Sequence, residues 1–249
     1  MATVIRQHAP IWLQKGMLYD ERDKYMFSKR INIFTGHFGS GKTEVAINFA
    51  LKLAKTHNKT SIVDADIVNP FFRTADAKDV LERNNIKVIL PLYANTNIDV
   101  PAMPSEIYML FRDREYKVVF DIGGDDLGAR AISRYNEEIL NDDYEMYFVV
   151  NAKRPMTDTP EKIEEMMYEI ESSARLKITG IINNTNLLDV TAAEDIIQGH
   201  EMISKVAEKY KIPIAFISGI GDVAAKAGKE LGMEVLQMER HIRLPWDEQ

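Results

Sequence analysis

From Ile31 onward, the chain alternates short runs of β-type residues with amphipathic helical stretches, and this alternation limits the folds that it can adopt. The candidate strands are Ile31–Thr35, Thr60–Asp64, Lys87–Leu90, Lys117–Asp121, Glu145–Asn151, Ile178–Asn183 and Pro213–Ser218. Helical patterns lie at about Thr43–Lys55, Thr74–Asn84, Ser105–Arg112, Leu127–Leu140, Pro160–Ser173, Ala192–Tyr210 and Asp222–Leu231. The chain is therefore predicted to form an α/β fold, with a mostly parallel sheet of about seven or eight strands and helices on both faces.

A length of 249 residues suits one large domain with a full core. The residues before Ile31 mix charged and aromatic side chains without a period. We therefore predict an N-terminal appendage over residues 1–30 and a single domain over residues 31–249. No apolar run approaches the roughly 20 residues that cross a bilayer, and the first residues lack the pattern of a secretory leader. The expected location is cytoplasmic, without a membrane partner.

Composition excludes several kinds of function. The chain has no cysteine, which rules out a disulfide framework, Cys-ligated zinc, thiolate-held iron–sulfur clusters and a Cys nucleophile. Its 31 Lys and Arg against 38 Asp and Glu give a net charge of −7. Nonspecific nucleic-acid binding is unlikely, because that mode needs clustered cations.

The sharpest motif is Gly36-His37-Phe38-Gly39-Ser40-Gly41-Lys42-Thr43, which matches the pattern G-x-x-x-x-G-K-[ST]. With equal residue frequencies, this pattern arises about once in 80,000 positions. The motif also lies between a predicted strand and an amphipathic helix, which is the setting that a phosphate-binding loop requires. The fold is therefore predicted to be of the P-loop NTPase type.

Each part of this loop has an expected role. The glycines let backbone N–H groups turn toward phosphate oxygens, and the helix N-terminus adds its positive end. Lys42 should reach the β- and γ-phosphates, and the Thr43 hydroxyl should bind Mg²⁺. The predicted nucleotide-binding residues are Gly36, His37, Phe38, Gly39, Ser40, Gly41, Lys42, Thr43 and Glu44.

Two further strands end in carboxylates. Asp121 closes a buried strand and precedes two glycines, so it can hold Mg²⁺ through water. Asp64 ends the second strand and Asp66 comes two residues later, so at this spacing they face the same side of an extended segment. One of them could orient an attacking water; a solvated acidic turn is the alternative.

Together these motifs resemble the MinD/ParA/Mrp-like P-loop ATPases of the CobQ/CobB/MinD/ParA superfamily, in the SIMIBI class, from Ile31 to about Ser218. The resemblance implies ATP and Mg²⁺ as cofactors. It makes Asp66 the catalytic switch I carboxylate, with a water-mediated place at the metal, and Asp121 the Walker B aspartate. Gly124 becomes the switch II glycine. Asn184 becomes a contact to adenine, although two asparagines at a strand end can equally form a turn.

The chain departs from that family at two positions. His37 stands where the family has a lysine that reaches across a nucleotide-bound dimer, and histidine is not a permanent cation near neutral pH. Glu44 replaces a threonine whose hydroxyl would serve the α-phosphate. The missing cysteines also exclude the branches that carry iron–sulfur clusters. The residues from Met233 to Trp246 alternate like an edge strand and are not strongly basic, which argues against docking on a membrane.

The expected function is that of a Mg-dependent ATP-binding protein, either a slow ATPase or a nucleotide switch, acting with Lys42 and Asp66. Asn151-Ala152-Lys153-Arg154 lacks the aspartate of a guanine box, so adenine is favoured. One alternative is an ATP-dependent ligase, synthase or kinase, in which Arg73, Lys153-Arg154 and the Pro91–Pro104 loop hold a small anionic substrate. Another is a non-hydrolytic switch that binds a partner. The client is an unknown protein or small molecule, and a homodimer is one partner that the resemblance allows.

Overall fold

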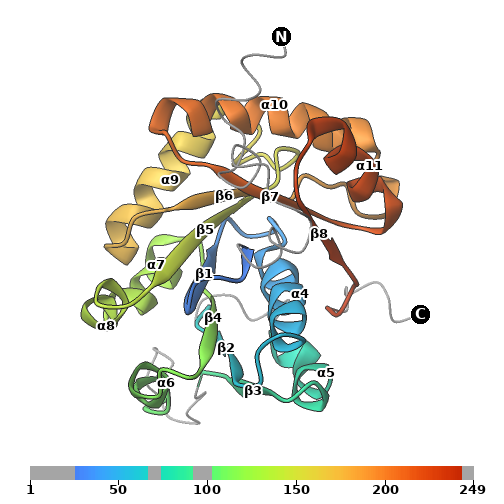
Figure 1. The fold of residues 1–249 in the computed structure, drawn as a ribbon. Coiled ribbons are helices and arrows are strands. Elements are labelled where there is room, and N and C mark those ends of the chain that lie inside the picture. Colours follow the sequence, from blue (N-terminus) through green and yellow to red (C-terminus); the bar gives the residue numbers. More distant parts are fainter. Residues whose placement is uncertain (1–25, 67–73, 92–102, 243–249) are drawn as a thin grey trace.

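In the computed structural model, eight parallel strands form one sheet in the order β3-β2-β4-β1-β5-β6-β7-β8 (Figure 1). The structure describes residues 26–66, 74–91 and 103–242. The strands are β1 (Ile31–Thr35), β2 (Thr60–Asp64), β3 (Ile86–Ile89), β4 (Lys117–Asp121), β5 (Tyr144–Val150), β6 (Gly180–Asn183), β7 (Ile214–Ile220) and β8 (Val235–Met238). The predicted α/β class is confirmed, and the alternating residues after Gly232 supply the eighth strand.

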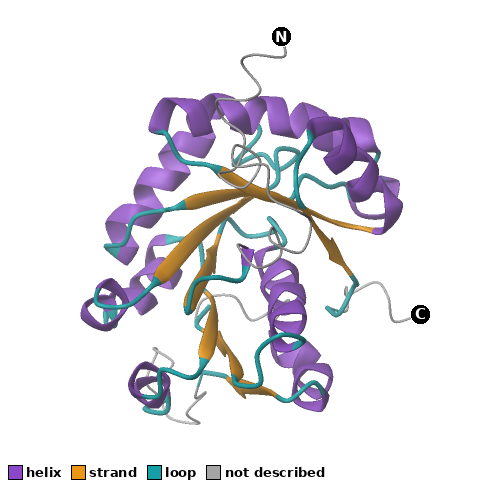
Figure 2. Ribbon diagram, viewed as in Figure 1, coloured by secondary structure: helices purple, strands orange, loops and turns teal. Residues whose placement is uncertain are grey.

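Helices cover both faces of this sheet (Figure 2). The α-helices are α4 (Lys42–Ala54), α5 (Lys78–Arg83), α6 (Ile107–Arg112), α7 (Asp126–Ser133), α8 (Asn136–Leu140), α9 (Pro160–Ala174), α10 (Ala193–Tyr210) and α11 (Gly221–Leu231). Two 3₁₀ turns, η1 (Thr74–Ala77) and η2 (Leu188–Val190), complete the described elements. One core packs the sheet against α6 to α10, and a second core packs its other face against α4 and α5. Burial on both faces explains the continuous apolar strands.

Two predicted helices differ in detail. The helix predicted over Leu127–Leu140 is wrong as a single element, because it divides into α7 and α8 around Tyr135. The Tyr135 ring is buried and packs 5.6 Å from Phe111 and 5.3 Å from Tyr108, centroid to centroid. Similarly, the helix predicted from Thr74 starts as the 3₁₀ turn η1 and becomes α-helical only at Lys78.

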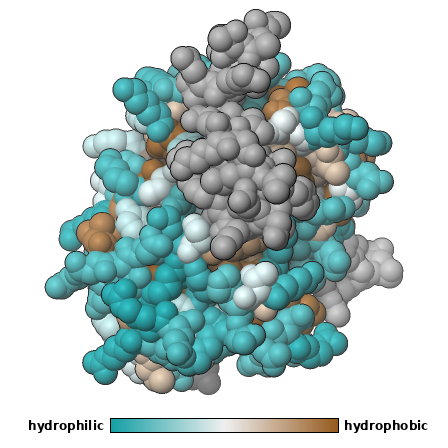
Figure 3. Space-filling view, in the orientation of Figure 1, coloured by the Kyte–Doolittle hydropathy of each residue, from teal (hydrophilic) through white to brown (hydrophobic). Residues whose placement is uncertain are grey.

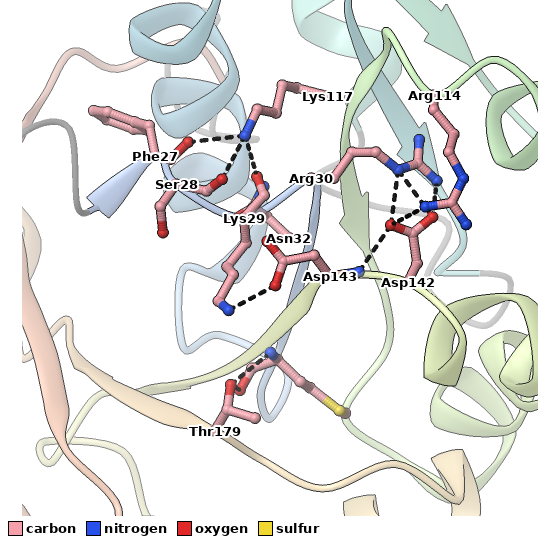
Figure 4. Close-up of polar contacts among 11 residues, drawn as sticks. Phe27, Ser28, Lys29, Arg30, Asn32, Arg114, Lys117, Asp142, Asp143 and Thr179 are labelled. Atoms are coloured by element: carbon pink, nitrogen blue, oxygen red, sulfur yellow. Dashed lines mark hydrogen bonds and ion pairs between the residues drawn. The ribbon is translucent and has the colours of Figure 1, made fainter.

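Polar side chains fix the strand entries at the amino edge of the sheet (Figure 4). Arg30 precedes β1 and pairs with Asp142 before β5, while its Nη1 donates to the carbonyls of Leu110 and Tyr116. Lys117 at the start of β4 donates to the carbonyls of residues 27–29, at 2.6 to 3.2 Å. These contacts hold β1 between β4 and β5.

Part of the predicted N-terminal appendage belongs to the core. Met26 and Phe27 are buried, and the Phe27 ring lies 4.8 Å from that of Phe49 in α4. Residues 1–25 lie outside the described residues, so the boundary at residue 30 stays a prediction. Among the described helices, none is long and apolar enough to cross a membrane.

The topology selects one end of the sheet for a ligand. From β1 the chain moves through α4 to β2 on one side, and from β4 it crosses to β5 on the other side of β1. In open parallel sheets, ligands bind at the carboxyl ends of strands where the strand order reverses. The loop after β1 lies at this switch point.

Candidate functional site

The motif forms the expected strand–loop–helix unit. β1 ends at Thr35, and α4 begins at Lys42, directly after Gly41. Gly41 has the left-handed backbone angle φ of 82°, and a Cβ atom there would lie 2.4 Å from Asn184 Nδ2. Conformation and space therefore both require glycine at this position. The first N–H groups of α4 have no partners within the helix and can serve as phosphate donors.

Gly124, after β4, lies against the backbone of the same loop. A Cβ atom at Gly124 would come within 2.2 Å of the Gly36 carbonyl oxygen and 2.8 Å of His37 N. Only a residue without a side chain lets the segment after β4 approach this closely. The next residue, Asp125, caps α7 by accepting a hydrogen bond from Gly128 N at 2.6 Å.

Lys42 and the predicted carboxylates converge beside the start of α4. Lys42 Nζ lies 2.9 Å from Asp66 Oδ2, and both side chains are largely buried. Burial disfavours the charged ammonium, but Asp66 and Asp121 outweigh it, so that the pKa of Lys42 lies above its usual value. Asp66 N also donates to Asp64 Oδ1, which fixes the turn that follows β2.

Asp121 is the more deeply buried acid of this group, at 1% exposure. Burial, together with the neighbouring Asp66, raises its pKa to about 6, while Lys42 and hydrogen bonds from Thr43 and Thr74 oppose the rise. Thr74 Oγ1 donates to Asp121 Oδ2 at 3.3 Å, and Asp121 Oδ1 has no hydrogen-bond partner among the described residues. An ionised, unpartnered oxygen beside the Thr43 hydroxyl fits a hydrated cation.

Mg²⁺ usually keeps several waters and takes one or two protein oxygens together with substrate phosphates. Thr43 and Asp121 provide such a pair. Within the described ranges, no group of three or more His, Asp or Glu side chains forms a cage that could hold a metal alone. The donor set therefore fits a cation that is shared with phosphates.

Other predicted loop residues have different environments. The Phe38 side chain is 54% exposed, and His37 Nδ1 lies 2.8 Å from the Phe38 carbonyl oxygen. Ser40 is buried, and its hydroxyl has no partner among the described residues. Gly39 lies under Arg154, whose Nε donates to the Gly39 carbonyl at 3.0 Å.

The sequence predicts that Arg154 forms an anion-binding pair with Lys153 in the ligase or kinase alternative. Its partner in that pair, Lys153, forms an ion pair with Asp195 at 3.0 Å. Arg154, in contrast, has no carboxylate within ion-pair distance in the described part of the chain, and it faces the same cavity as the loop. The sequence signal that could have indicated a role for Arg154 at the loop is its position as a basic residue shortly after the central strand β5. Arg73 and most of the Pro91–Pro104 loop lie outside the described residues.

Asn184 supports the loop from the end of β6. It is buried, its Nδ2 donates to the Ser40 carbonyl at 2.7 Å, and its Oδ1 accepts from the Ser218 hydroxyl at 2.9 Å. Asn184 therefore lies next to the loop that follows β1, and both ends of its amide are engaged. Its contact to a base remains a prediction.

Glu44 points to an unexpected neighbour, the segment after β8. Its Oε1 accepts from His241 N at 2.8 Å, and its Oε2 accepts from Ile242 N at 3.1 Å. Burial raises the pKa of the Glu44 carboxyl, although these backbone N–H groups partly offset the rise. No local sequence pattern predicts this contact, because it joins residues 197 and 198 positions apart.

A cavity of about 780 Å³ opens along the loop. One end is lined by loop residues that include Lys42, Thr43 and Arg154. The other end extends past the ends of β6 and β7 to Met238, Arg240 and Ile242. Asp66 and Asp121 are not among the lining residues and lie behind Lys42 and Thr43. The cavity thus runs from the loop before α4 to the residues that follow the edge strand β8.

Neither a protein-family model nor a curated protein sequence matches the chain. The solved structures that match the chain include the three that follow. The Signal Recognition Particle 54 kDa protein from Aeropyrum pernix in complex with GDP is 18% identical over 80% of this chain and 46% of that chain, with a TM-score of 0.48. A nucleotide-binding protein in complex with ADP from Archaeoglobus fulgidus is 18% identical over 86% and 92%, with a TM-score of 0.45.

The signal recognition particle receptor FtsY from Elizabethkingia anophelis is 16% identical over 93% of this chain and 71% of that chain, with a TM-score of 0.47. The chain spans about half the length of the first of these structures. Likenesses at these identities and TM-scores carry no conclusion about activity. The eight-stranded parallel sheet, with its phosphate loop at the switch point, is itself a fold of the P-loop NTPase type.

Proposed function

We propose that this chain is a Mg-dependent ATP-binding protein that cleaves ATP slowly at the γ-phosphate, as an ATPase or nucleotide switch of the MinD/ParA-like class. The observation that carries this proposal is the convergence of Lys42, Asp66 and Asp121 at the N-terminus of α4. A cation, two carboxylates and a helix N-terminus are the parts that phosphoryl transfer needs.

In this account, the loop amides and Lys42 bind the β- and γ-phosphates, and Thr43 and Asp121 hold Mg²⁺. The metal would neutralise charge on the phosphate oxygens. Lys42 pairs with Asp66 in the structure, so phosphate oxygens must take over this contact when ATP binds. Asp66 then orients the water that attacks the γ-phosphate, and Lys42 stabilises the charge that develops.

Arg154 gives specific support to one alternative, an ATP-dependent ligase, synthase or kinase. Its guanidinium is held at the rim of the phosphate loop and has no carboxylate partner among the described residues. It could therefore bind a small carboxylate or phosphate next to ATP. A non-hydrolytic switch that binds a partner protein is the remaining alternative. A homodimer is a further proposal. It would have to form without the lysine that reaches across the dimer in the resembled family, because His37 stands at that position.

Phosphate release from ATP distinguishes these proposals. We expect slow, Mg-dependent release of phosphate from ATP alone. In a binding competition, we expect GTP to displace labelled ATP less effectively than unlabelled ATP does. Release of phosphate that occurs only with a small carboxylate acceptor would favour the ligase or synthase. Formation of ADP without free phosphate, only in the presence of an alcohol acceptor, would favour the kinase, because the phosphoryl group then stays on the acceptor. Tight binding without any turnover would favour the non-hydrolytic switch. Failure to bind any nucleoside triphosphate would contradict all three.

A further inference from the structure

Two side chains of α4 bind the backbone of residues 239–242, which follow the edge strand β8. This clasp consists of Glu44 and Asn48 on α4 and the backbone of residues 239–242. Asn48 Oδ1 accepts from Glu239 N, and Asn48 Nδ2 donates to the Glu239 carbonyl, both at 2.9 Å. One turn earlier, the two Glu44 oxygens accept from the N–H groups of His241 and Ile242. Two side chains thus satisfy four backbone groups that follow the edge strand β8.

The clasp is internally braced. Asn48 Nδ2 also donates to the Glu44 carbonyl at 2.9 Å and approaches Glu44 Oε1 at 3.3 Å. Glu44 and Asn48 are four residues apart on one face of α4, and Asn48 is buried at 7% exposure. Because even a partly buried carboxylate is costly without donors, the N–H groups of His241 and Ile242 stabilise Glu44 in this position.

The segment held in this way is a wall of the cavity. Met238, Arg240 and Ile242 alternate along it and all line the cavity, while the backbone of residues 239, 241 and 242 faces α4. Across the cavity, Arg240 Nη2 pairs with Asp189 Oδ1 of η2 at 2.7 Å. The segment therefore forms the part of the cavity wall that follows β8.

We propose that Glu44 and Asn48 are positioning residues for the nucleoside: by holding residues 239–242, they shape the end of the cavity that receives the base and ribose. This inference rests on the proposed nucleotide site and extends it. Glu44 lies where a hydroxyl for the α-phosphate was expected, yet its carboxylate is committed to the segment and would repel phosphate if it turned toward it. The clasp thus affects affinity for the nucleoside part and leaves the phosphate subsite intact.

Two ligands distinguish binding at the phosphate subsite from binding at the part of the cavity proposed for the nucleoside. MgATP occupies both the phosphate subsite and the nucleoside end, whereas inorganic triphosphate with Mg²⁺ occupies the phosphate subsite alone. Glu44→Gln replaces one acceptor oxygen with an NH₂ group, which faces a backbone N–H of the segment and cannot accept from it. We expect the Kd for MgATP to rise about tenfold in this variant, and the Kd for triphosphate to change less than about twofold.

Further variants show whether a loss of affinity in Glu44→Gln comes from a folding defect. Arg240→Ala removes a partly exposed lining side chain outside the clasp, and the same selective loss of MgATP affinity is expected. Glu82→Gln, on the exposed face of α5, is the matched control for loss of a carboxylate and should change neither Kd. Thermal unfolding confirms that each variant is folded.

Equal weakening of both ligands by Glu44→Gln and Arg240→Ala would overturn the inference, as would unchanged affinity for MgATP in both variants. These results would leave the proposed function standing, because the wild-type protein would still bind MgATP. Failure of the wild-type protein to bind either ligand would instead overturn the proposed function and this inference with it.

Discussion

At the scale of single residues, the site depends on how one lysine is shared. Lys42 Nζ pairs with Asp66 in the structure, and Asp121 lies close enough to raise the pKa of Lys42 further. Asp64 acts on Lys42 as well, so three carboxylates surround one buried ammonium, and their net negative charge would favour a bound cation. The roles of Asp66 and Asp121 can therefore be separated by mutation, since one is assigned to water and the other to metal.

Asp66→Asn should lower the rate of ATP hydrolysis by about 10²-fold or more, because an amide cannot orient or deprotonate water as a carboxylate does. The Kd for MgATP should stay within a few-fold of the wild-type value, since Lys42 and the loop remain. Single-turnover phosphate release measures the rate. Asp76→Asn, an exposed acid in η1, is the control. An unchanged rate in Asp66→Asn would remove Asp66 from catalysis.

The raised pKa of Asp121 predicts that stability and affinity for MgATP both depend on pH. Its pKa is about 6 in the folded protein, above the ordinary value of 3.8, so burial favours the protonated form. Its contribution to stability is therefore fully present below about pH 4 and is lost as the pH rises through 6. Mg²⁺ needs the ionised form, so affinity for MgATP should fall as the pH drops below 6.

The measurement compares the Kd for MgATP at pH 5 to 7.5 in the wild-type protein and in Asp121→Asn. The phosphates of the ligand titrate in both proteins, so the difference between the two curves isolates the carboxylate. We expect Asp121→Asn to bind MgATP more weakly at pH 7.5 and to show a flatter profile. Parallel curves would contradict the assignment of Asp121 to the metal.

At the scale of elements, the loop after β4 and the loop after β1 form one packed unit. Gly124 leaves no room for a Cβ atom, which would lie 2.2 Å from the Gly36 carbonyl oxygen. Gly124→Ala should therefore push the two loops apart, lower stability by about 1–3 kcal/mol and weaken binding of MgATP more than tenfold. Thermal unfolding and a binding titration measure the two effects.

Gly221→Asn, at the start of α11, provides the control. A Cβ atom there meets nothing within 4 Å, and asparagine tolerates the φ of 67° better than other side chains. It should change neither stability nor affinity appreciably. Wild-type affinity in Gly124→Ala would show that the contact between the two loops does not support binding.

The sequence predicted the elements that are set by local patterns. All seven candidate strands and the phosphate loop with its helix were located, because continuous apolar runs and a glycine motif are local signals. The break at Tyr135 was missed, since it depends on rings from α6 that pack against the buried tyrosine. The clasp between α4 and residues 239–242 was missed as well, because it joins residues 191 to 198 positions apart.

At the scale of the whole molecule, an ion pair that stabilises the fold and the loop proposed to bind phosphate lie at opposite edges of the sheet. The pair of Arg30 and Asp142 lies at the amino edge, whereas the phosphate loop lies at the carboxyl edge. The face seen in Figure 3 is largely hydrophilic outside the segments drawn in grey. A change at the amino edge should therefore act on the fold alone.

Asp142→Asn tests this separation. The buried Arg30 guanidinium would lose its charged partner, at a cost of about 3 kcal/mol. For a domain of this size, the melting temperature should fall by about 6–12 °C. The Kd for MgATP, measured well below the melting temperature, should stay within about twofold. A large loss of affinity in a folded variant would show that the two edges are coupled.

The central claim, that Lys42 and its loop bind the phosphates of a nucleotide, is tested most directly by titrating MgATP into the wild-type protein and into Lys42→Ala. The control is Lys55→Ala, which removes an exposed lysine just beyond the other end of α4. We predict saturable binding by the wild-type protein and by Lys55→Ala, and binding at least about 100-fold weaker in a folded Lys42→Ala. Wild-type affinity in Lys42→Ala would contradict the account.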